Sequence, residues 1–153
     1  MIGVNGTAVF RDGRAYGTEN NKKIIVLMTD GVNGLAGNGD AGSANISDYS
    51  AYGYLGVWRL GLTTPRTYDD VSRFLDERTL TACTNAKAAG VTIYTVLFSH
   101  GNLTPAQVTN STNLLRSCAS ENGFFYQATD LPSLNNAFVT IAGGLSPKVR
   151  LGR

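Results

Sequence analysis

The segment at residues 22–31, which reads KKIIVLMTDG, constrains the fold of this chain more than any other. Its apolar run is short, rich in β-branched residues and apolar on both faces, which is typical of a strand covered by helices on each side. The run ends in Thr29-Asp30-Gly31, so Asp30 stands at the carboxyl end of the predicted strand. In open α/β sheets, ligands and metal ions bind at that edge. The segment therefore predicts a central parallel strand with a candidate ligand-binding carboxylate, Asp30.

The next part of the chain alternates helical and strand patterns. Apolar residues at helical spacing predict a helix over residues 68–89, with Asp69 or Asp70 as its cap and Gly90 as its stop. The β-branched and aromatic run that follows predicts a second strand over residues 91–98. Such an order favours an α/β fold with a parallel sheet and right-handed crossovers.

The C-terminal part continues this alternation. Thr104-Pro105 supplies a cap and a proline at the first helical position, so a helix is expected to begin there. Residues 109–113 are poor helix formers and predict a point at which this helix can break. A third strand is expected over residues 124–128, and Asp130 caps a last helix. The apolar face of that helix is expected to comprise Leu131, Leu134, Ala137, Phe138, Ile141 and Leu145.

Two segments lack such a pattern. Residues 1–22 are rich in Gly and Asn and are interpreted as an irregular lead-in, while glycines interrupt every period over residues 31–64. A loop of that length in a compact domain is expected to be functional or mobile. Its second half is aromatic (Tyr49, Tyr52, Tyr54 and Trp58). These rings either pin the loop to the domain by burying area or form a contact surface for a partner.

Length and composition exclude several classes of protein. The 153 residues, 42% of them hydrophobic, suffice for one domain with a core. The net charge of +2, with scattered Lys and Arg, does not favour nucleic-acid binding. The sequence shows no run of apolar residues long enough for a transmembrane helix and no signal peptide at residues 1–7. Taken alone, these features indicate a cytosolic chain, or one that has lost its export signal.

The chain contains two cysteines, Cys83 and Cys118. Two cysteines are compatible with one disulfide or with two buried thiols. The number of cysteines by itself does not decide between a disulfide and two free thiols.

The same residues resemble a known family. The run at residues 25–31 looks like the fourth strand of a von Willebrand factor type A (vWA) domain, a Rossmann-like parallel sheet with flanking helices. The larger part of the chain looks closer to the TadG-like proteins of the bacterial Flp/tight-adherence (Tad) pilus system. The matching segments, in order and within roughly residues 20–151, are 29–31, 49–54, 83–90, 93–96, 115–120 and 134–138.

The resemblance implies a partial domain. Type A domains begin with a strand followed by Asp-x-Ser-x-Ser, which supplies most of a metal-ion-dependent adhesion site, and this motif is absent from the sequence. The first three strands of the family also have no room before residue 23. Residues 23–151 are therefore expected to form the C-terminal part of such a domain. Mg²⁺ or Ca²⁺ would be bound in the intact domain, with Asp30 as one ligand of a site that this chain leaves incomplete, and no cofactor is expected here.

The resemblance also implies function and location. It points to a non-enzymatic, protein-binding adhesion module of pilus assembly, with a pilus or envelope component as partner and no contact with nucleic acid. This chain is expected to make no membrane contact itself, although the full-length protein would be membrane-anchored in the periplasm or cell envelope. Disulfides persist there, and successive crossover helices lie on the same side of a sheet, which favours a Cys83–Cys118 disulfide.

Three alternatives remain to be weighed. Residues 30–33 also resemble the Gly-Asp-Gly-Val-Asn-Asp hinge of haloacid-dehalogenase-type (HAD-like) enzymes, which would make Asp30 part of a metal-dependent phosphohydrolase. The second aspartate of that hinge is replaced by Gly34, and the Asp-Lys-Thr-Gly nucleophile motif is absent from the sequence.

His100, the only histidine, has no Gly-x-Ser-x-Gly partner motif and is interpreted as a polar loop residue. Finally, half a sheet with an unpaired strand edge can be a fragment without independent function.

Overall fold

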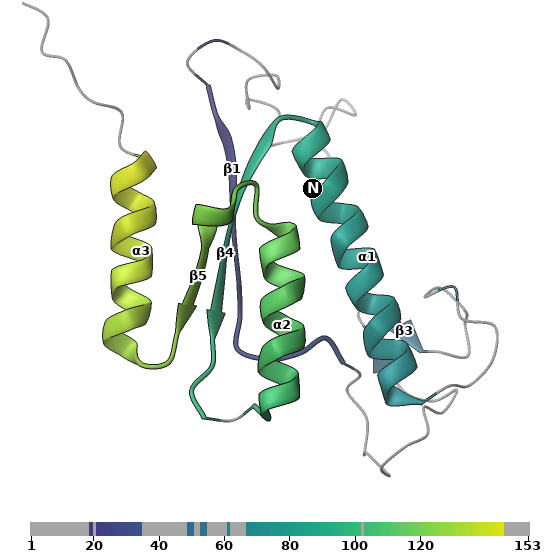
Figure 1. Ribbon diagram of the computed structural model, residues 1–153. Helices are drawn as coiled ribbons and strands as arrows, with labels where there is room; N and C mark the ends of the chain where they lie inside the picture. Colours follow the sequence, from purple (N-terminus) through teal and green to yellow (C-terminus); the bar gives the residue numbers. More distant parts are fainter. Residues whose placement is uncertain are drawn as a thin grey trace, which may run out of the picture.

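The computed structural model describes residues 19, 21–34, 49–50, 53–54, 61, 67–101 and 103–145. The main elements follow the order strand, helix, strand, helix, strand, helix (Figure 1). They are β1 (Lys23–Thr29), α1 (Tyr68–Ala88), β4 (Val91–Phe98), α2 (Pro105–Cys118), β5 (Phe125–Ala128) and α3 (Leu131–Leu145). A short antiparallel pair, β2 (Tyr49–Ser50) with β3 (Gly53–Tyr54), and a 3-10 turn at Asn122–Phe124 complete the described elements. Among these helices, none is long and apolar enough to cross a membrane.

The main sheet is parallel and has the order β1-β4-β5. In its register Val26 lies beside Tyr94 of β4, and Val96 of β4 lies beside Tyr126 of β5. The predicted α/β class with a parallel sheet is therefore confirmed. Because all three strands run the same way, the residues that follow β1, β4 and β5 meet at one edge of the sheet.

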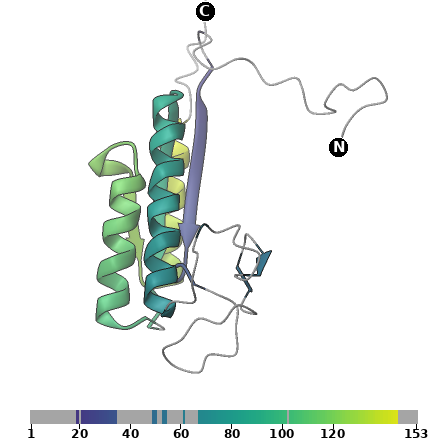
Figure 2. The same ribbon diagram turned by 90° about the vertical axis from the view of Figure 1, so that its right-hand side faces the viewer.

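Helices cover the two faces of this sheet unequally (Figures 1 and 2). α1 and α2 lie on one face, where Cys83, Val91, Ile93 and Cys118 form a buried cluster. α3 lies on the other face, where Tyr94, Val96, Ala137 and Ile141 form a second cluster. The core is thus split by β4, whose side chains alternate between the two clusters.

β1 departs from the expectation of a strand covered on both faces. Ile25, Val26 and Met28 remain 43%, 40% and 41% exposed. α3 packs mainly against β5 and β4 and leaves Val26 and Met28 on its face partly exposed, while Ile25 lies on the opposite face, beside α1 and α2. The apolar sequence of β1 correctly predicted a strand, but its complete burial was a wrong prediction because coverage depends on which elements lie beside it.

The start of α1 also differs from the prediction. Its N-cap is Thr67, whose hydroxyl accepts a hydrogen bond from the Asp70 backbone N–H at 3.2 Å. The Asp70 carboxylate accepts the Thr67 backbone N–H in return, which completes a capping box. Asp70 therefore takes part in the cap, as one of the two residues predicted, but it acts from the third helical position and the N-cap residue itself is Thr67. The expected stop is confirmed, because Gly90 adopts a φ of 82° that favours glycine.

α2 begins as predicted but does not break. Thr104 caps it in a capping box with Gln107, and Pro105 is its first residue. The helix then runs without interruption through the weak segment at residues 109–113. Tertiary contacts compensate for the poor helix propensity, since Ser111 is buried and donates a hydrogen bond to Gly31 O at 3.3 Å.

α3 is capped by Asp130, as expected, since the Ser133 N–H donates to Asp130 Oδ1 at 2.7 Å. Its apolar face is only partly buried. Ala137 and Ile141 lie in the core, whereas Leu131 and Phe138 are 72% and 40% exposed. The apolar face expected from the sequence is therefore only partly covered by the sheet.

Candidate functional site at the carboxyl edge of the sheet

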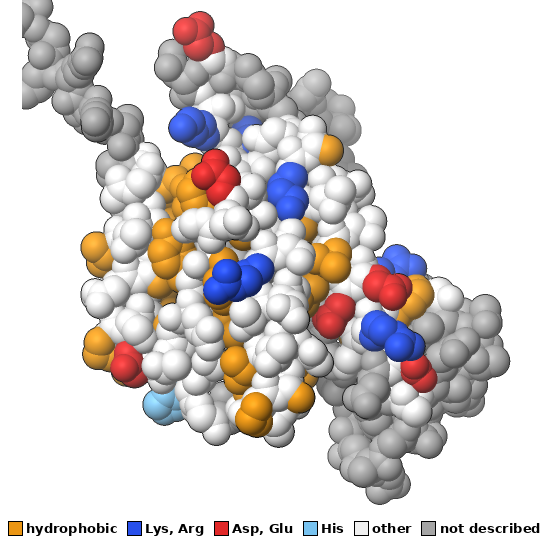
Figure 3. Space-filling view, viewed as in Figure 1, with side chains coloured by type: hydrophobic (Ala, Val, Ile, Leu, Met, Phe, Trp, Pro, Cys, Tyr) orange, Lys and Arg blue, Asp and Glu red, His pale blue; other side chains and the backbone are white. Residues whose placement is uncertain are grey.

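The carboxyl edge of the sheet brings together residues that are far apart in sequence. Asp30 follows β1, His100 follows β4 and Asp130 follows β5, and all three are exposed. The sheet thus places Asp30 where the sequence predicted. On the face shown in Figure 3, the Lys/Arg and Asp/Glu side chains of the described residues are interspersed and form no patch of a single sign.

The turn directly after β1 is closed by hydrogen bonds. Thr29 Oγ1 accepts the Gly31 N–H at 3.2 Å and lies 3.1 Å from Gly31 O, to which it can donate. The same carbonyl also accepts a bond from Ser111 of α2. These contacts tie the turn to the end of its own strand and to α2.

Asn33 fixes the same segment to α1. Its Nδ2 donates to Asp76 Oδ1 at 2.8 Å and to Thr79 Oγ1 at 3.3 Å. Its backbone carbonyl accepts a bond from Ser72 Oγ at 2.6 Å. The sequence analysis missed Asn33 and its partners, because they lie 39 to 46 residues apart and no local motif links them.

The anchored segment at residues 29–34 presents two side chains to solvent. Asp30 is exposed, and Val32 is 42% exposed. A carboxylate and an apolar side chain are therefore displayed on backbone that is held from three sides. Such a segment is suited to contact another macromolecule, because its ordering does not have to be achieved on binding.

His100 follows the central strand of the sheet, β4, and lies against the chain that follows β5. Its Nδ1 is 3.1 Å from Thr129 O, and because a carbonyl only accepts, Nδ1 carries a proton. The ring stacks on Phe98 with a centroid distance of 5.7 Å. These contacts agree with the interpretation of His100 as a polar loop residue.

The Asp130 carboxyl at this edge has a lowered pKa. The Ser133 hydroxyl, followed by the Ser133 backbone N–H, donates to the carboxylate and holds its pKa below the usual value. Attraction to His100 adds to this lowering, while desolvation opposes it. Since the main cause is the cap of α3, the shift reports a structural role for Asp130.

The described residues do not fit a complete metal site. None of them form a group of three or more His, Cys, Asp or Glu side chains that could hold an ion. A Ca²⁺ ion takes about six to eight oxygen ligands, and Mg²⁺ takes six in near-octahedral geometry. Asp30 and the engaged Thr29 hydroxyl are too few for either.

The two cysteines form the disulfide that was expected. Cys83 of α1 and Cys118 at the end of α2 are bonded, with Cα atoms 5.3 Å apart. Both are buried, at 7% and 0% exposed. Lys87, one turn after Cys83, donates to Ser117 O at 2.8 Å and so adds a second link between the helices.

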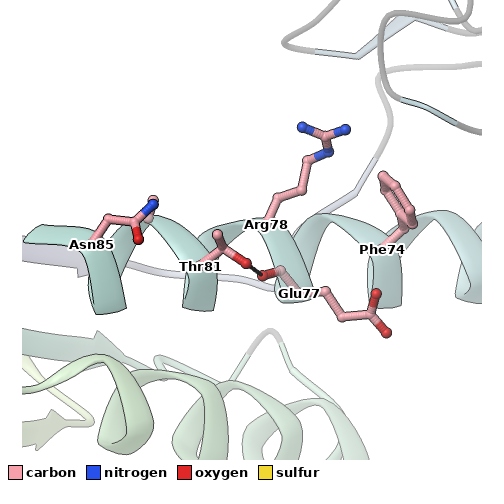
Figure 4. Close-up of a pocket in the computed structure, with 6 residues that line it drawn as sticks. Phe74, Glu77, Arg78, Thr81 and Asn85 are labelled. Carbon is pink, nitrogen blue, oxygen red and sulfur yellow. Dashed lines mark hydrogen bonds between the residues drawn. The ribbon is translucent and has the colours of Figure 1, made fainter.

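A hollow of about 470 Å³ runs along the outer side of α1 (Figure 4). It is lined by Phe74, Glu77, Arg78, Thr81, Ala82 and Asn85. The Arg78 guanidinium lies 5.1 Å from the centre of the Phe74 ring, and Thr81 Oγ1 donates to Glu77 O. The lining combines one acid, one base and small polar groups along a single helix, which resembles a solvated helix surface more than a catalytic site.

The aromatic loop is only partly described. Tyr52 and Trp58 lie outside the described residues, so both predictions, a loop pinned to the domain and a contact surface for a partner, stay open.

No protein-family model, no curated protein and no solved structure matches the chain.

Proposed function

We propose that this chain is a non-enzymatic, protein-binding module of a bacterial pilus-assembly protein of the Flp/Tad type, built like the C-terminal part of a vWA domain. The observation that carries the proposal is the anchored segment at residues 29–34, which holds Asp30 and Val32 outward at the carboxyl edge. The order of strands and helices agrees with the larger family, and the TadG-like assignment rests on the sequence resemblance.

The contact itself would be direct. In the intact domain of the resembled family, Mg²⁺ or Ca²⁺ at this edge accepts a carboxylate from the partner. In this chain, the exposed Asp30 would contribute its carboxylate to the contact with a basic side chain of the partner. Val32 adds an apolar contact beside it. The partner would be a pilus or envelope component.

The Cys83–Cys118 disulfide supports a location outside the cytoplasm. Disulfides form and persist in oxidising compartments such as the bacterial periplasm and are rare in the cytosol. The proposed location is therefore the periplasm or the cell envelope.

A photo-crosslinking amino acid at position 32, in cells that make the protein, tests the proposal. We expect crosslinks from this position to a pilus or envelope protein, and their loss when Asp30→Ala is added. The matched control is the same crosslinker at Thr81, an exposed position on α1. Equal crosslinking from both positions, or none from position 32, would indicate a fragment without this function.

An assay of hydrolysis distinguishes the enzymatic alternative. With p-nitrophenyl phosphate and Mg²⁺ we expect no turnover that depends on Asp30. Hydrolysis by the wild-type chain that disappears in Asp30→Asn would overturn the binding-module proposal in favour of a phosphohydrolase.

A further inference from the structure

The disulfide and the anchored segment at residues 29–34 are held by the same face of α1. Three residues of α1 bond to this segment, at intervals of four and three positions that place them on one face of the helix. They are Ser72, Asp76 and Thr79. Cys83 follows Thr79 after four residues, so it continues the same face at a rise of about 6 Å along the helix. The disulfide therefore leaves α1 one turn beyond the last anchor of the segment.

α2 repeats this arrangement. Ser111, whose hydroxyl donates to Gly31 O at 3.3 Å, is followed four residues later by Leu115 and seven residues later by Cys118. All three residues are buried, so they form the inward face of α2. α1 and α2 pack against each other and run in the same direction, because each returns from one parallel strand to the next. The anchors and the disulfide thus lie along one shared side of the helix pair.

The segment bridges the two helices over a short span. Gly31 O accepts its bond from α2, and Asn33, two residues later, bonds to α1 through its side chain and its backbone carbonyl. Two residues of chain reach at most about 7 Å. Each hydrogen bond also requires its donor and acceptor to lie within about 3 Å of each other. The segment can therefore keep both sets of bonds only while α1 and α2 hold their present spacing.

We propose that the Cys83–Cys118 disulfide fixes this spacing and thereby keeps the segment at residues 29–34 anchored. The disulfide links the two helices covalently. Lys87 adds a bond to Ser117 O at 2.8 Å beside it, but a solvent-accessible ammonium can exchange such a bond for water. Without the disulfide the helices stay packed but vary in spacing, and the segment then keeps its bonds to only one of them.

Formation of the disulfide prepares the segment for binding. A disulfide-bearing oxidant accepts two electrons and two protons from the thiols of Cys83 and Cys118, so the S–S bond forms here and the oxidant leaves as two thiols. Since these cysteines are buried, the bond is shielded from reductants once it has formed. The consequence for partner binding rests on the proposed function, whereas the anchoring of the segment does not.

NMR relaxation of the backbone N–H groups of residues 31–34 tests the proposal. In the Cys83→Ala/Cys118→Ala variant we expect their order parameters to fall from about 0.85, typical of rigid backbone, to below about 0.6. The matched control is Ile141→Ala, which lowers stability from the opposite face of the sheet and should leave these order parameters unchanged. Unchanged order parameters in the disulfide variant, or an equal fall in both variants, overturn the proposal.

A reciprocal measurement keeps the test valid if the two alanines disturb the packing between the helices. If the disulfide anchors the segment, loss of an anchor must favour the reduced thiols by the same factor. Dithiothreitol reduces the bond with two electrons and two protons and closes into its own disulfide. We expect Asn33→Ala to shift this equilibrium about tenfold toward the thiols, a size usual for coupling between two sites, and Ile141→Ala to leave it unchanged.

The equilibrium also gives a clear negative result. An equilibrium that Asn33→Ala does not shift, or that Ile141→Ala shifts as far, overturns the proposal. Both measurements use the chain without a partner, so a failure of the coupling is distinct from a failure of the proposed function.

Discussion

The two faces of the sheet are held by different kinds of interaction. On the face of α1 and α2, a disulfide joins the helices, and the buried Thr95 hydroxyl donates to Leu115 O at 3.0 Å. On the face of α3, the core consists of apolar and aromatic packing, with the Tyr94 and Phe124 rings stacked at 4.2 Å. The first face is fixed by directional bonds, and the second depends on contact area.

The two faces also differ in what holds their helices in place, although both leave part of β1 exposed, Ile25 on the first face and Val26 and Met28 on the second. On the first face, covalent and polar links fix the positions of both helices and tie the segment at residues 29–34 to them. On the second face, one helix covers two of the three strands and leaves apolar groups on both β1 and α3 exposed. The first face therefore holds the segment at residues 29–34 in place, and the second leaves Val26 and Met28 of β1 partly exposed.

Removal of the disulfide should cause the largest loss of stability. The Cys83→Ala/Cys118→Ala variant should unfold at lower denaturant, because the bond closes a loop with a sequence separation of 35. In the chain-entropy model such a loop contributes about 4 kcal/mol. Urea unfolding of the variant, and of the wild type with and without reductant, measures the effect. An unfolding midpoint that reduction leaves unchanged would show that the disulfide adds no stability to the face of α1 and α2.

Truncation of a core side chain on the α3 face should have the next largest effect. Ile141 is only 3% exposed, and Ile141→Ala should cost about 3 kcal/mol through lost burial and the cavity left behind. Val139→Ala, two residues earlier and exposed, should change the free energy of unfolding of the monomer by no more than about 0.5 kcal/mol. Chemical denaturation at low protein concentration compares them, and equal losses would show that α3 is not oriented as described.

The buried hydroxyl on the α1/α2 face should contribute a smaller amount. Thr95→Val keeps the shape of the side chain but removes the bond to Leu115 O, at a cost of about 1 kcal/mol. Thr95→Ser retains the hydroxyl and serves as the control for the bond. A Thr95→Val variant as stable as the wild type would mean that the hydrogen bond to Leu115 O adds no stability to this face.

The smallest effect concerns the cap of α3 and depends on pH. Asp130 has a lowered pKa in the folded chain, so its contribution is present above its pKa in the unfolded chain and is lost as the pH falls through the folded value. Asp130→Asn should therefore reduce the loss of thermal stability on acidification below pH ~4. Melting temperatures of both proteins at neutral and acidic pH provide the measurement. Identical pH profiles would contradict a capping role for the Asp130 carboxylate.

Much of the fold was predictable from local sequence. The bounds of β1 and β4 follow from short β-branched runs, and Gly90, Thr104-Pro105 and Asp130 mark helix ends through their individual chemistry. The disulfide required one further step, the same-side placement of successive crossovers. The strand bounds and helix ends are determined by a few neighbouring residues and can be predicted without the fold, whereas the disulfide depends on how the helices are placed.

The candidate site was predictable only in part. The apolar run before Asp30 predicted a strand that ends just before this carboxylate. In a parallel sheet the residue after a strand lies at the carboxyl edge, so the position of Asp30 followed from the sequence. The bonds from Asn33 to Asp76 and from Ser72 to Asn33 could not be predicted, since each joins residues that only the crossover of α1 brings together. Whether Asp30 sits on anchored or free backbone therefore depends on tertiary contacts.

The sequence alone determined the order of the elements and the position of Asp30 after a strand, while the pairing of Cys83 with Cys118 is given by the structure. Tertiary structure decided which apolar residues are buried. Val26 and Val96 have the same side chain on the same face of neighbouring strands, yet they are 40% and 0% exposed. The physical reason is that a side chain is buried only where another element packs on it, and α3 packs mainly on β5 and β4.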